Sequence, residues 1–455
     1  MSVSLSPLSE FLAPGPRSAT ATPVDILRFN TCGSVDDGKS TLIGRLLYDS
    51  KSLMEDQLES LERSADITGG GQINLANLTD GLRAEREQGI TIDVAYRYFA
   101  TPRRKFIIAD TPGHVQYTRN MVTGASNANV SIILVDARAG VIEQSRRHTA
   151  IASLLRIPHL VVAINKMDLV GWSEARFDEI RAQFEEFLPR LDIKDVKFIP
   201  LSALNGDNVV TASPHTPWYP GPPLLGHLES VHIGSDWNLH GFRLPVQWVN
   251  RPNNPRDPAL HDFRGFSGQI AGGVVRVGQK ILALPAGLTT TVKQIWALDG
   301  PLAEAFCPQS VTLVLAHDID VSRGSMLIGL DESLPGAGTD LHAQVCWMHP
   351  RPLQRGKKYL LKHTSSTVQT VVTAIEHRLD IASLEPESVP SELALNDLGE
   401  IRLRTARPLF YDSYATNRLT GSFILLEPGS NATVAAGMLY PAVETVRPES
   451  PDYVI

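Results

Sequence analysis

The stretch "GSVDDGKST", residues 33–41, decides the fold of this chain of 455 residues. Its two glycines, together with Lys39 and Ser40, satisfy the pattern G-x-x-x-x-G-K-[ST]. An apolar run typical of a strand ends at Cys32, and a run with the spacing of a helix begins at Lys39. This is the context that a phosphate-binding loop requires, so the sequence predicts a strand, a loop and a helix that together bind a nucleotide.

Each residue type of this loop has a physical role in holding phosphates. Glycines let backbone N–H groups converge on the oxygens, Lys39 reaches the β and γ phosphates, and the Ser40 hydroxyl ligates Mg²⁺. A chance glycine turn is the alternative, and the flanking strand and helix disfavour it. We expect the nucleotide to lie against Gly33, Ser34, Val35, Asp36, Asp37, Gly38, Lys39, Ser40 and Thr41.

The stretch "IIADTPGH", residues 107–114, predicts the γ-phosphate side of the site. Asp110 ends a predicted strand, where its carboxylate holds Mg²⁺ through a water, and Gly113 offers its N–H to a γ phosphate. D-T-P-G alone is also a common turn sequence, but after a P-loop it favours the nucleotide site. His114 follows the turn, and we expect it to orient the attacking water; a generic surface histidine is the alternative.

Thr91, in "EREQGITIDV", precedes an alternating strand. It is either an ordinary β-branched strand residue or a switch that completes the Mg²⁺ shell only when the γ phosphate is present. We favour the switch, because such a threonine orders its loop and reports the nucleotide state. The predicted metal ligands are thus Ser40, Thr91 and Asp110, and the predicted catalytic residues are Lys39, Thr91 and His114.

The stretch "NKMD", residues 165–168, follows the strand-like run "HLVVAI" and is typical of a base-reading loop. Asp168 can accept two hydrogen bonds from guanine N1–H and N2–H₂, which adenine does not offer, so the motif favours GTP over ATP. Asn165 would brace the loops and the Lys166 stem would lie over the purine. Backbone donors near guanine O6 are expected from Ser202, Ala203 and Leu204.

The rest of the chain divides by its hydrophobic pattern. Apolar runs alternate with helix-like segments up to about residue 231, which indicates a mostly parallel sheet with helices on both faces, and short alternating runs between glycines then indicate two small antiparallel β-barrels. The sequence predicts an α/β P-loop GTPase domain followed by these barrels. The predicted boundaries are an N-terminal tail 1–24, the GTPase domain 25–232, barrels 242–334 and 338–446, and a C-terminal tail 447–455.

Composition and charge limit the classes of function that the chain can have. The net charge of −7 and pI of about 6.0 disfavour recruitment of nucleic acid or an anionic membrane, and no apolar run is long enough to span a bilayer. Three scattered cysteines fit a reducing compartment, so we expect a cytoplasmic protein. The basic run from Arg351 to Lys362 is best interpreted as a solvated face or a protein contact. Cys346 and His349 have C-x-x-H spacing, but barrel core plus a surface histidine is favoured over a metal site.

The motifs resemble those of the translational GTPases and, within them, the family of the GTPase subunit of bacterial sulfate adenylyltransferase. The finer match is carried by "GSVDDGKSTLIGRLLYDSK", "DGLRAEREQGITIDVAYRYF", "KFIIADTPGHVQYTRNMVTGAS" and "VVAINKMDLV". Elongation factors usually have histidine at position 37, whereas this branch has aspartate. A carboxylate so near the phosphates is unfavourable unless it points to solvent or holds a cation.

The resemblance implies GTP/GDP and Mg²⁺ as cofactors. It also implies that GTP hydrolysis drives formation of adenosine 5'-phosphosulfate and pyrophosphate from ATP and sulfate, the first step of sulfate assimilation. A separate, smaller adenylyl-transferring subunit would bind ATP and sulfate, in a heterodimer or a higher assembly, and the chain here has no S-G-G-x-D-S pyrophosphate loop of its own. Two alternatives stay open: an elongation factor that delivers aminoacyl-tRNA, and a GTP-binding regulator with negligible turnover.

Overall fold

The structure, a computed structural model, describes most of the three predicted domains. The described residues are 26–51, 75, 91, 93–114, 117–191, 193, 195–234, 237–252, 263–380, 385–387 and 391–442. Both predicted tails and most of the stretch between the P-loop helix and Thr91 lie outside them.

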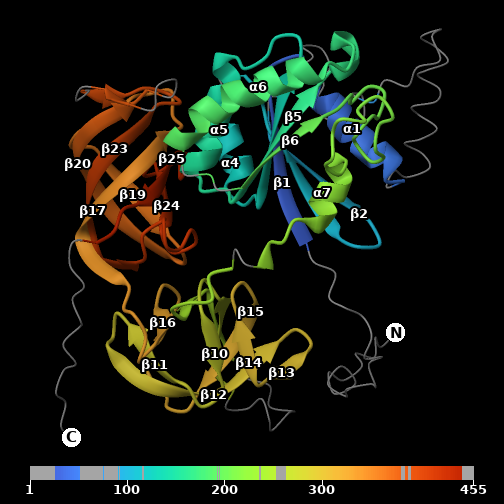
Figure 1. Cartoon of the computed structure of the whole chain (residues 1–455). Helices are drawn as coiled ribbons and strands as arrows, with labels where there is room; N and C mark the ends of the chain where they lie inside the picture. Colours follow the sequence, from blue (N-terminus) through green and yellow to red (C-terminus); the bar gives the residue numbers. More distant parts are fainter. Residues whose placement is uncertain are drawn as a thin grey trace, which may run out of the picture.

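A six-stranded sheet forms the centre of the N-terminal domain, in the order β2-β3-β1-β4-β5-β6 (Figure 1). All neighbours pair in parallel except the edge strand β2, which is antiparallel to β3. The strands are β1 (Ile26–Cys32), β2 (Ala95–Ala100), β3 (Lys105–Asp110), β4 (Val130–Asp136), β5 (His159–Asn165) and β6 (Asp195–Pro200). The helices are α1 (Lys39–Asp49), α4 (Thr118–Ala125), α5 (Glu143–Leu154), α6 (Glu174–Phe187) and α7 (Leu224–Ser230), with short 3-10 turns η4 (Met167–Val170) and η5 (Leu188–Arg190).

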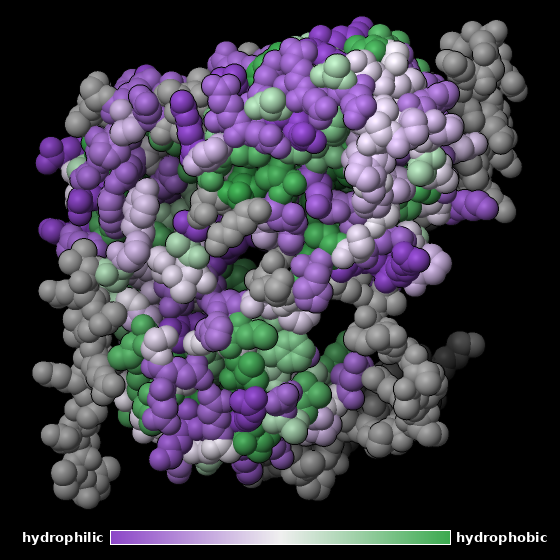
Figure 2. All heavy atoms as spheres, in the orientation of Figure 1, coloured by the Kyte–Doolittle hydropathy of each residue, from purple (hydrophilic) through white to green (hydrophobic). Residues whose placement is uncertain are grey.

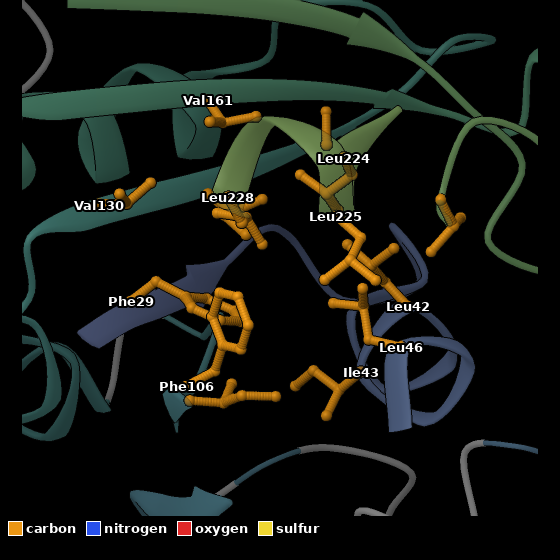
Figure 3. Packing of buried hydrophobic residues seen from close by; sticks show 14 of the residues in the cluster. Phe29, Leu42, Ile43, Leu46, Phe106, Val130, Val161, Leu224, Leu225 and Leu228 are labelled. Carbon is orange, nitrogen blue, oxygen red and sulfur yellow. The ribbon is translucent and has the colours of Figure 1, made fainter. Parts of the chain in front are cut away.

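Helices cover both faces of this sheet, which explains its apolar central strands. Every residue of β4, "VSIILVD", is buried, as expected for a parallel strand packed on both sides. Because successive side chains point to opposite faces, Ile132 and Leu134 pack with α1 and α7, whereas Ile133 and Val135 pack with α4, α5 and α6. Figure 3 shows the first of these cores, in which Leu42 and Leu46 of α1 lie among leucines of α7 and aromatic rings of the sheet.

Two antiparallel barrels follow, as the sequence predicted (Figure 1). We call them the first and second barrel. The first contains β7 (Arg243–Pro245), β8 (Trp248–Asn250), β9 (Gly265–Gln269), β10 (Val274–Arg276), β11 (Lys280–Leu284), β12 (Leu288–Ala297), β13 (Gly300–Leu302), β14 (Glu304–Phe306), β15 (Ser310–Leu315) and β16 (Met326–Gly329). The second contains β17 (Gly336–Trp347), β18 (Leu353–Gln354), β19 (Lys358–His363), β20 (Ser366–Leu379), β21 (Pro386–Glu387), β22 (Glu392–Leu393), β23 (Leu398–Tyr411), β24 (Ser422–Leu426) and β25 (Thr433–Leu439), and pairing of β19 with β20 closes it.

The second barrel packs against α4 and α5 of the N-terminal domain. Its Cys346, Met348 and Leu398 belong to the same apolar cluster as Val122 of α4 and Ile151 of α5. In Figure 2, apolar side chains gather where α4 faces this barrel. The prediction that Cys346 lies in the barrel core was therefore wrong, because its side chain belongs to the core that the barrel shares with the N-terminal domain.

Polar contacts fix the same interface. The Tyr414 hydroxyl donates to the Leu155 carbonyl at 2.9 Å, and the Arg418 Nη2 donates to the Ser126 carbonyl at 2.7 Å. A cavity of about 550 Å³ lies between the domains, lined mainly by apolar side chains of α4, α5 and the second barrel. Helix α5 is thus held by the second barrel along its C-terminal end.

Within the described ranges, no helix combines the length and the apolar character needed to cross a lipid bilayer.

Candidate nucleotide site

The predicted P-loop lies at the carboxyl edge of the parallel sheet, between β1 and α1. Strand β3 ends at Asp110 and β5 ends at Asn165, and both flank this edge. Parallel strands place their carboxyl ends side by side, so motifs that are far apart in the sequence meet there. The edge is the expected location of a ligand in an open α/β sheet.

Two glycines are required by close backbone approaches. Gly38 has φ of +92°, and a Cβ there would lie 2.4 Å from Asn165 Nδ2. At Gly113, a Cβ would lie 2.0 Å from the Gly33 carbonyl oxygen. The D-T-P-G turn therefore packs directly on the start of the P-loop, and a larger residue at either position would push the phosphate-binding segments apart.

Lys39, Thr91 and Asp110 meet at one point. The Lys39 Nζ donates to the Thr91 hydroxyl at 2.6 Å and forms an ion pair with the Asp110 carboxylate. Both charged side chains are almost fully buried, with 8% and 3% exposure. Thr91 and Asp110 are two of the three predicted Mg²⁺ ligands, and here their oxygens share the Lys39 ammonium as a stand-in cation. The donor set, hard oxygens with a carboxylate, suits Mg²⁺.

Ser40, the third predicted ligand, is the second residue of α1 and is half-buried. Thr41 follows it and is also half-buried, whereas Val35 and Asp36 in the loop are exposed. The structure thus gives the P-loop a buried side toward the sheet and an open side toward solvent.

Asp37 has an arrangement that the sequence did not predict. Its carboxylate is turned into the loop, where it accepts a hydrogen bond from the Ser34 backbone N–H at 2.6 Å. The side chain is buried, and burial raises the pKa of Asp37 to about 6, with the Ser34 N–H acting in the opposite direction and the Asp136 charge raising it further. The backbone N–H of Ser34, a P-loop donor, is therefore engaged by the Asp37 carboxylate.

Asn165 joins the P-loop to the loop after β6. Its Nδ2 donates to the Asp37 carbonyl at 2.7 Å, and its Oδ1 accepts from the Ala203 N–H at 2.9 Å. The Ala203 N–H, expected near guanine O6, is therefore donated to Asn165 in this structure. Arg45 of α1 holds the same loop through the carbonyls of Ala203 and Leu204, and Ser202 Oγ accepts from Asn205 N–H at 3.3 Å.

Lys166 is fixed by an acid that the sequence analysis missed. Its Nζ donates to Asp136 Oδ2 at 3.0 Å and to the Asp36 carbonyl, and Asp136 also pairs with Arg138 at 2.7 Å. Burial opposes ionisation of Asp136, but hydrogen bonds from Arg138 and Lys166 hold its pKa well below the usual range. The sequence did carry one signal for Asp136. It is the acid that ends the apolar run "VSIILVD", and this strand pairs with the strand that leads into N-K-M-D. Asp168 is half-buried in η4.

Helix α5 contacts Gly113 through a side-chain hydrogen bond. The Gln144 Nε2 donates to the Gly113 carbonyl at 2.6 Å and lies 3.1 Å from His148 Nε2. His148 is fully buried, and burial lowers its pKa to about 4, so the ring is neutral at pH 7. Both residues were missed, since a helical glutamine and histidine four residues apart carry no motif. His114 is exposed, with its ring 6.1 Å from that of Tyr117.

Family models match the first and the last of the three domains. The model of the elongation factor Tu GTP binding domain matches residues 24–248, and a GTP-eEF1A C-terminal domain-like model matches residues 340–440. The chain is 54% identical to a bifunctional enzyme CysN/CysC of Mycobacterium tuberculosis, over 94% of this chain and 69% of that protein. It is 55% identical to sulfate adenylyltransferase subunit 1 of Bacteroides fragilis, over 92% of this chain and 87% of the relative. The same subunit of Teredinibacter turnerae is 52% identical, over 94% and 90%.

Proposed function

This chain belongs to the family of sulfate adenylyltransferase subunit 1, and on that premise we propose that it hydrolyses GTP to drive sulfate activation by a partner subunit. The driven reaction forms adenosine 5'-phosphosulfate and pyrophosphate from ATP and sulfate. One observation in this chain supports the motor role best: the γ-phosphate side of the site, Thr91 and Asp110, converges on the P-loop Lys39.

We propose that GTP binds with its phosphates in the P-loop and its base beside the N-K-M-D segment. Lys39 would then exchange Thr91 and Asp110 for phosphate oxygens, because the phosphates carry more negative charge than one carboxylate. Ser40, Thr91 and Asp110 would hold Mg²⁺, which supplies charge neutralisation on the phosphate oxygens. His114, at the exposed end of the D-T-P-G turn, is our candidate for orienting the attacking water.

We propose the guanine contacts on the basis of the same geometry. Asp168 in η4 would accept from the base, and Lys166, held by Asp136, would cover the purine. The Ala203 N–H would turn from Asn165 Oδ1 toward guanine O6, and Asp37 would release the Ser34 N–H to the phosphates. Both exchanges replace a hydrogen bond within the protein by one to the nucleotide, so binding reorganises the site locally.

The chain also offers a connection from the γ phosphate to the rest of the molecule. Gly113 is the predicted γ-phosphate donor, and Gln144 ties its carbonyl to α5. Helix α5 in turn ends against the second barrel, where the Leu155 carbonyl accepts from Tyr414. We propose that a shift of the turn on hydrolysis moves α5 relative to the barrel and so reaches the adenylyl-transferring subunit. We place the complex in the cytoplasm, consistent with three buried free cysteines in the described chain.

The test is to copurify the chain with its partner and measure adenylylsulfate formation from ATP and sulfate. Product that requires GTP, and is lost with a non-hydrolysable GTP analogue, supports the proposal. Product formation independent of GTP, or GTP-dependent capture of aminoacyl-tRNA without any product, would overturn it. Phosphate release in the absence of partner separates a motor from a regulator with negligible turnover.

A further inference from the structure

A cluster of histidine and glutamate side chains lies on the outer face of the second barrel, away from the nucleotide site. It involves three adjacent strands, β17, β23 and β20. The ligand atoms of His342, Glu376 and Glu400 all lie within 4.8 Å of one another. Among the described residues, this is the one such group of histidine, cysteine or carboxylate side chains.

A β-bulge assembles the cluster. His377 pairs with Glu400 across β20 and β23, and the register shifts between Ile375 and His377, so that Glu376 is the extra residue. In a regular strand two consecutive side chains point to opposite faces, but a bulge re-aims one of them. Glu376 and His377 are consequently both half-buried, and each contacts a charged side chain of β23.

The Glu400 carboxylate is the centre of the group. One oxygen contacts His342 Nε2, and the other lies 3.1 Å from His377 Nε2. In the described structure His342 Nε2 is shielded from solvent and has no hydrogen-bond partner, because its contact with Glu400 lacks hydrogen-bond geometry. The Tyr440 ring covers the imidazole, with centroids 4.6 Å apart. A shielded imidazole nitrogen that lies against a carboxylate without a hydrogen bond is an arrangement in which a cation could bind both groups.

We propose that this cluster binds one divalent transition metal, with Zn²⁺ as the best match. Imidazole nitrogen and carboxylate oxygen are the donors that Zn²⁺ takes in proteins besides thiolate, whereas Mg²⁺ and Ca²⁺ favour oxygen alone. His342, Glu400 and Glu376 form the set, with His377 on the second oxygen of Glu400.

Arg402 competes with the cation. Its Nε donates to Glu376 Oε1 at 2.6 Å, and this bond lowers the pKa of Glu376. The guanidinium therefore neutralises one acid of the cluster without metal, and Glu376 must leave it, or share an oxygen, to ligate Zn²⁺. Removal of Arg402 should therefore free Glu376 to ligate the cation and make Zn²⁺ binding tighter.

The position of the cluster gives the cation a structural role. Residues two apart on a strand share a face, so Glu400 lies on the same face as Leu398, which is buried in the core shared with the N-terminal domain. His377 is likewise two residues from Leu379, which packs on that core. A cation bound here would tie β17, β23 and β20 together beside the contact with α4 and α5. The proposal is independent of the sulfate-activating function.

The experiment uses the full chain, stripped with a chelator and then saturated with GDP and Mg²⁺ so that the nucleotide site is occupied. Zinc chloride is titrated calorimetrically, and cobalt chloride is titrated with visible absorption as the readout of tetrahedral nitrogen and oxygen ligation. The variants are His342→Ala, Glu400→Gln and Arg402→Gln. His349→Ala is the matched control, because it removes another histidine of the same barrel, outside the cluster.

We expect one Zn²⁺ per chain in the wild type and in His349→Ala, with binding at least about 10-fold weaker in His342→Ala and Glu400→Gln. Arg402→Gln should bind Zn²⁺ several-fold more tightly. Equal binding by wild type and His342→Ala, or no binding by the wild type, would show that the cluster is only an ion-pair network. If His342→Ala fails to fold, Arg402→Gln decides alone, because unchanged or weaker binding there also refutes the site.

Discussion

The Lys39 ammonium donates to the Thr91 hydroxyl at 2.6 Å, although the two residues are 52 positions apart in the sequence. The same ammonium pairs with the buried Asp110 carboxylate. The P-loop, the predicted switch threonine and the D-T-P-G segment are therefore connected through one cation. Any ligand that draws Lys39 away releases both Thr91 and Asp110 at once.

Lys39→Met should destabilise the protein without nucleotide as well as abolish GTP binding. The substitution leaves the Asp110 carboxylate buried without its cation, which costs about 3 kcal/mol in comparable buried pairs. Urea unfolding of the nucleotide-free protein measures this cost. The double variant Lys39→Met with Asp110→Asn should recover most of it, and a loss below about 1 kcal/mol in the single variant would show that the pair contributes little.

Asp37→Asn should stabilise the protein at neutral pH and not at acid pH. The folded-state pKa of Asp37 is raised from 3.8 to about 6, so the native state binds the proton more tightly than the unfolded state. The contribution of Asp37 to the free energy of unfolding is therefore most favourable below about pH 4, and it is lost as the pH rises through 6. Asparagine keeps an acceptor for the Ser34 N–H without the charge.

The gap in unfolding free energy between Asp37→Asn and wild type should grow from near zero at pH 4 to about 2 kcal/mol at pH 7.5. Chemical denaturation across this range tests it. Asp36→Asn, at the exposed neighbour, is the control for a general effect of loop charge. A gap that is constant with pH would contradict the buried, protonatable Asp37.

Asp168→Asn should move nucleotide preference from GTP toward xanthosine triphosphate. Xanthine presents an oxygen where guanine presents its amino group, so an amide donor fits it and a carboxylate does not. The variant loses the carboxylate that accepts both guanine donors, so its affinity for GTP should fall by roughly 100-fold. This matches about 3 kcal/mol for hydrogen bonds to a charged group. Competition binding with both nucleotides is the measurement, and an unchanged preference would refute the assignment of Asp168.

Gln144→Leu should lower the rate of GTP hydrolysis by about 10-fold while GDP affinity stays near wild type. The glutamine holds the Gly113 carbonyl at 2.6 Å and touches no group expected to bind the base or the β phosphate. A positioning role predicts that kcat falls while the KM for GTP changes little. Asn205→Ala, on the opposite side of the site, is the control. Equal loss of GDP and GTP binding would indicate a general collapse of the loop instead.

Much of the fold was predictable because its signals are local. The apolar run of β4, the glycine spacing of the P-loop and the alternation in the barrels each lie within a few consecutive residues. The predicted start of α1 at Lys39 was confirmed for the same reason, since a left-handed Gly38 immediately before it ends the loop. The two partners of Gly113 on α5 could not be predicted, because a helical Gln-x-x-x-His spacing is equally typical of a surface or a core.

By itself the sequence determined the class of the protein and the order of its domains, and it predicted which segments bind the phosphates and the base. These properties depend on residue type and short spacing, which the covalent chain fixes. Only the tertiary structure decided that Asp37 turns into its own loop, that Asp136 anchors Lys166, and that Cys346 lies in a core shared between domains. Those outcomes depend on contacts between residues that are far apart in the sequence. The burial and the charge environment of each side chain are set by these contacts rather than by its neighbours along the chain.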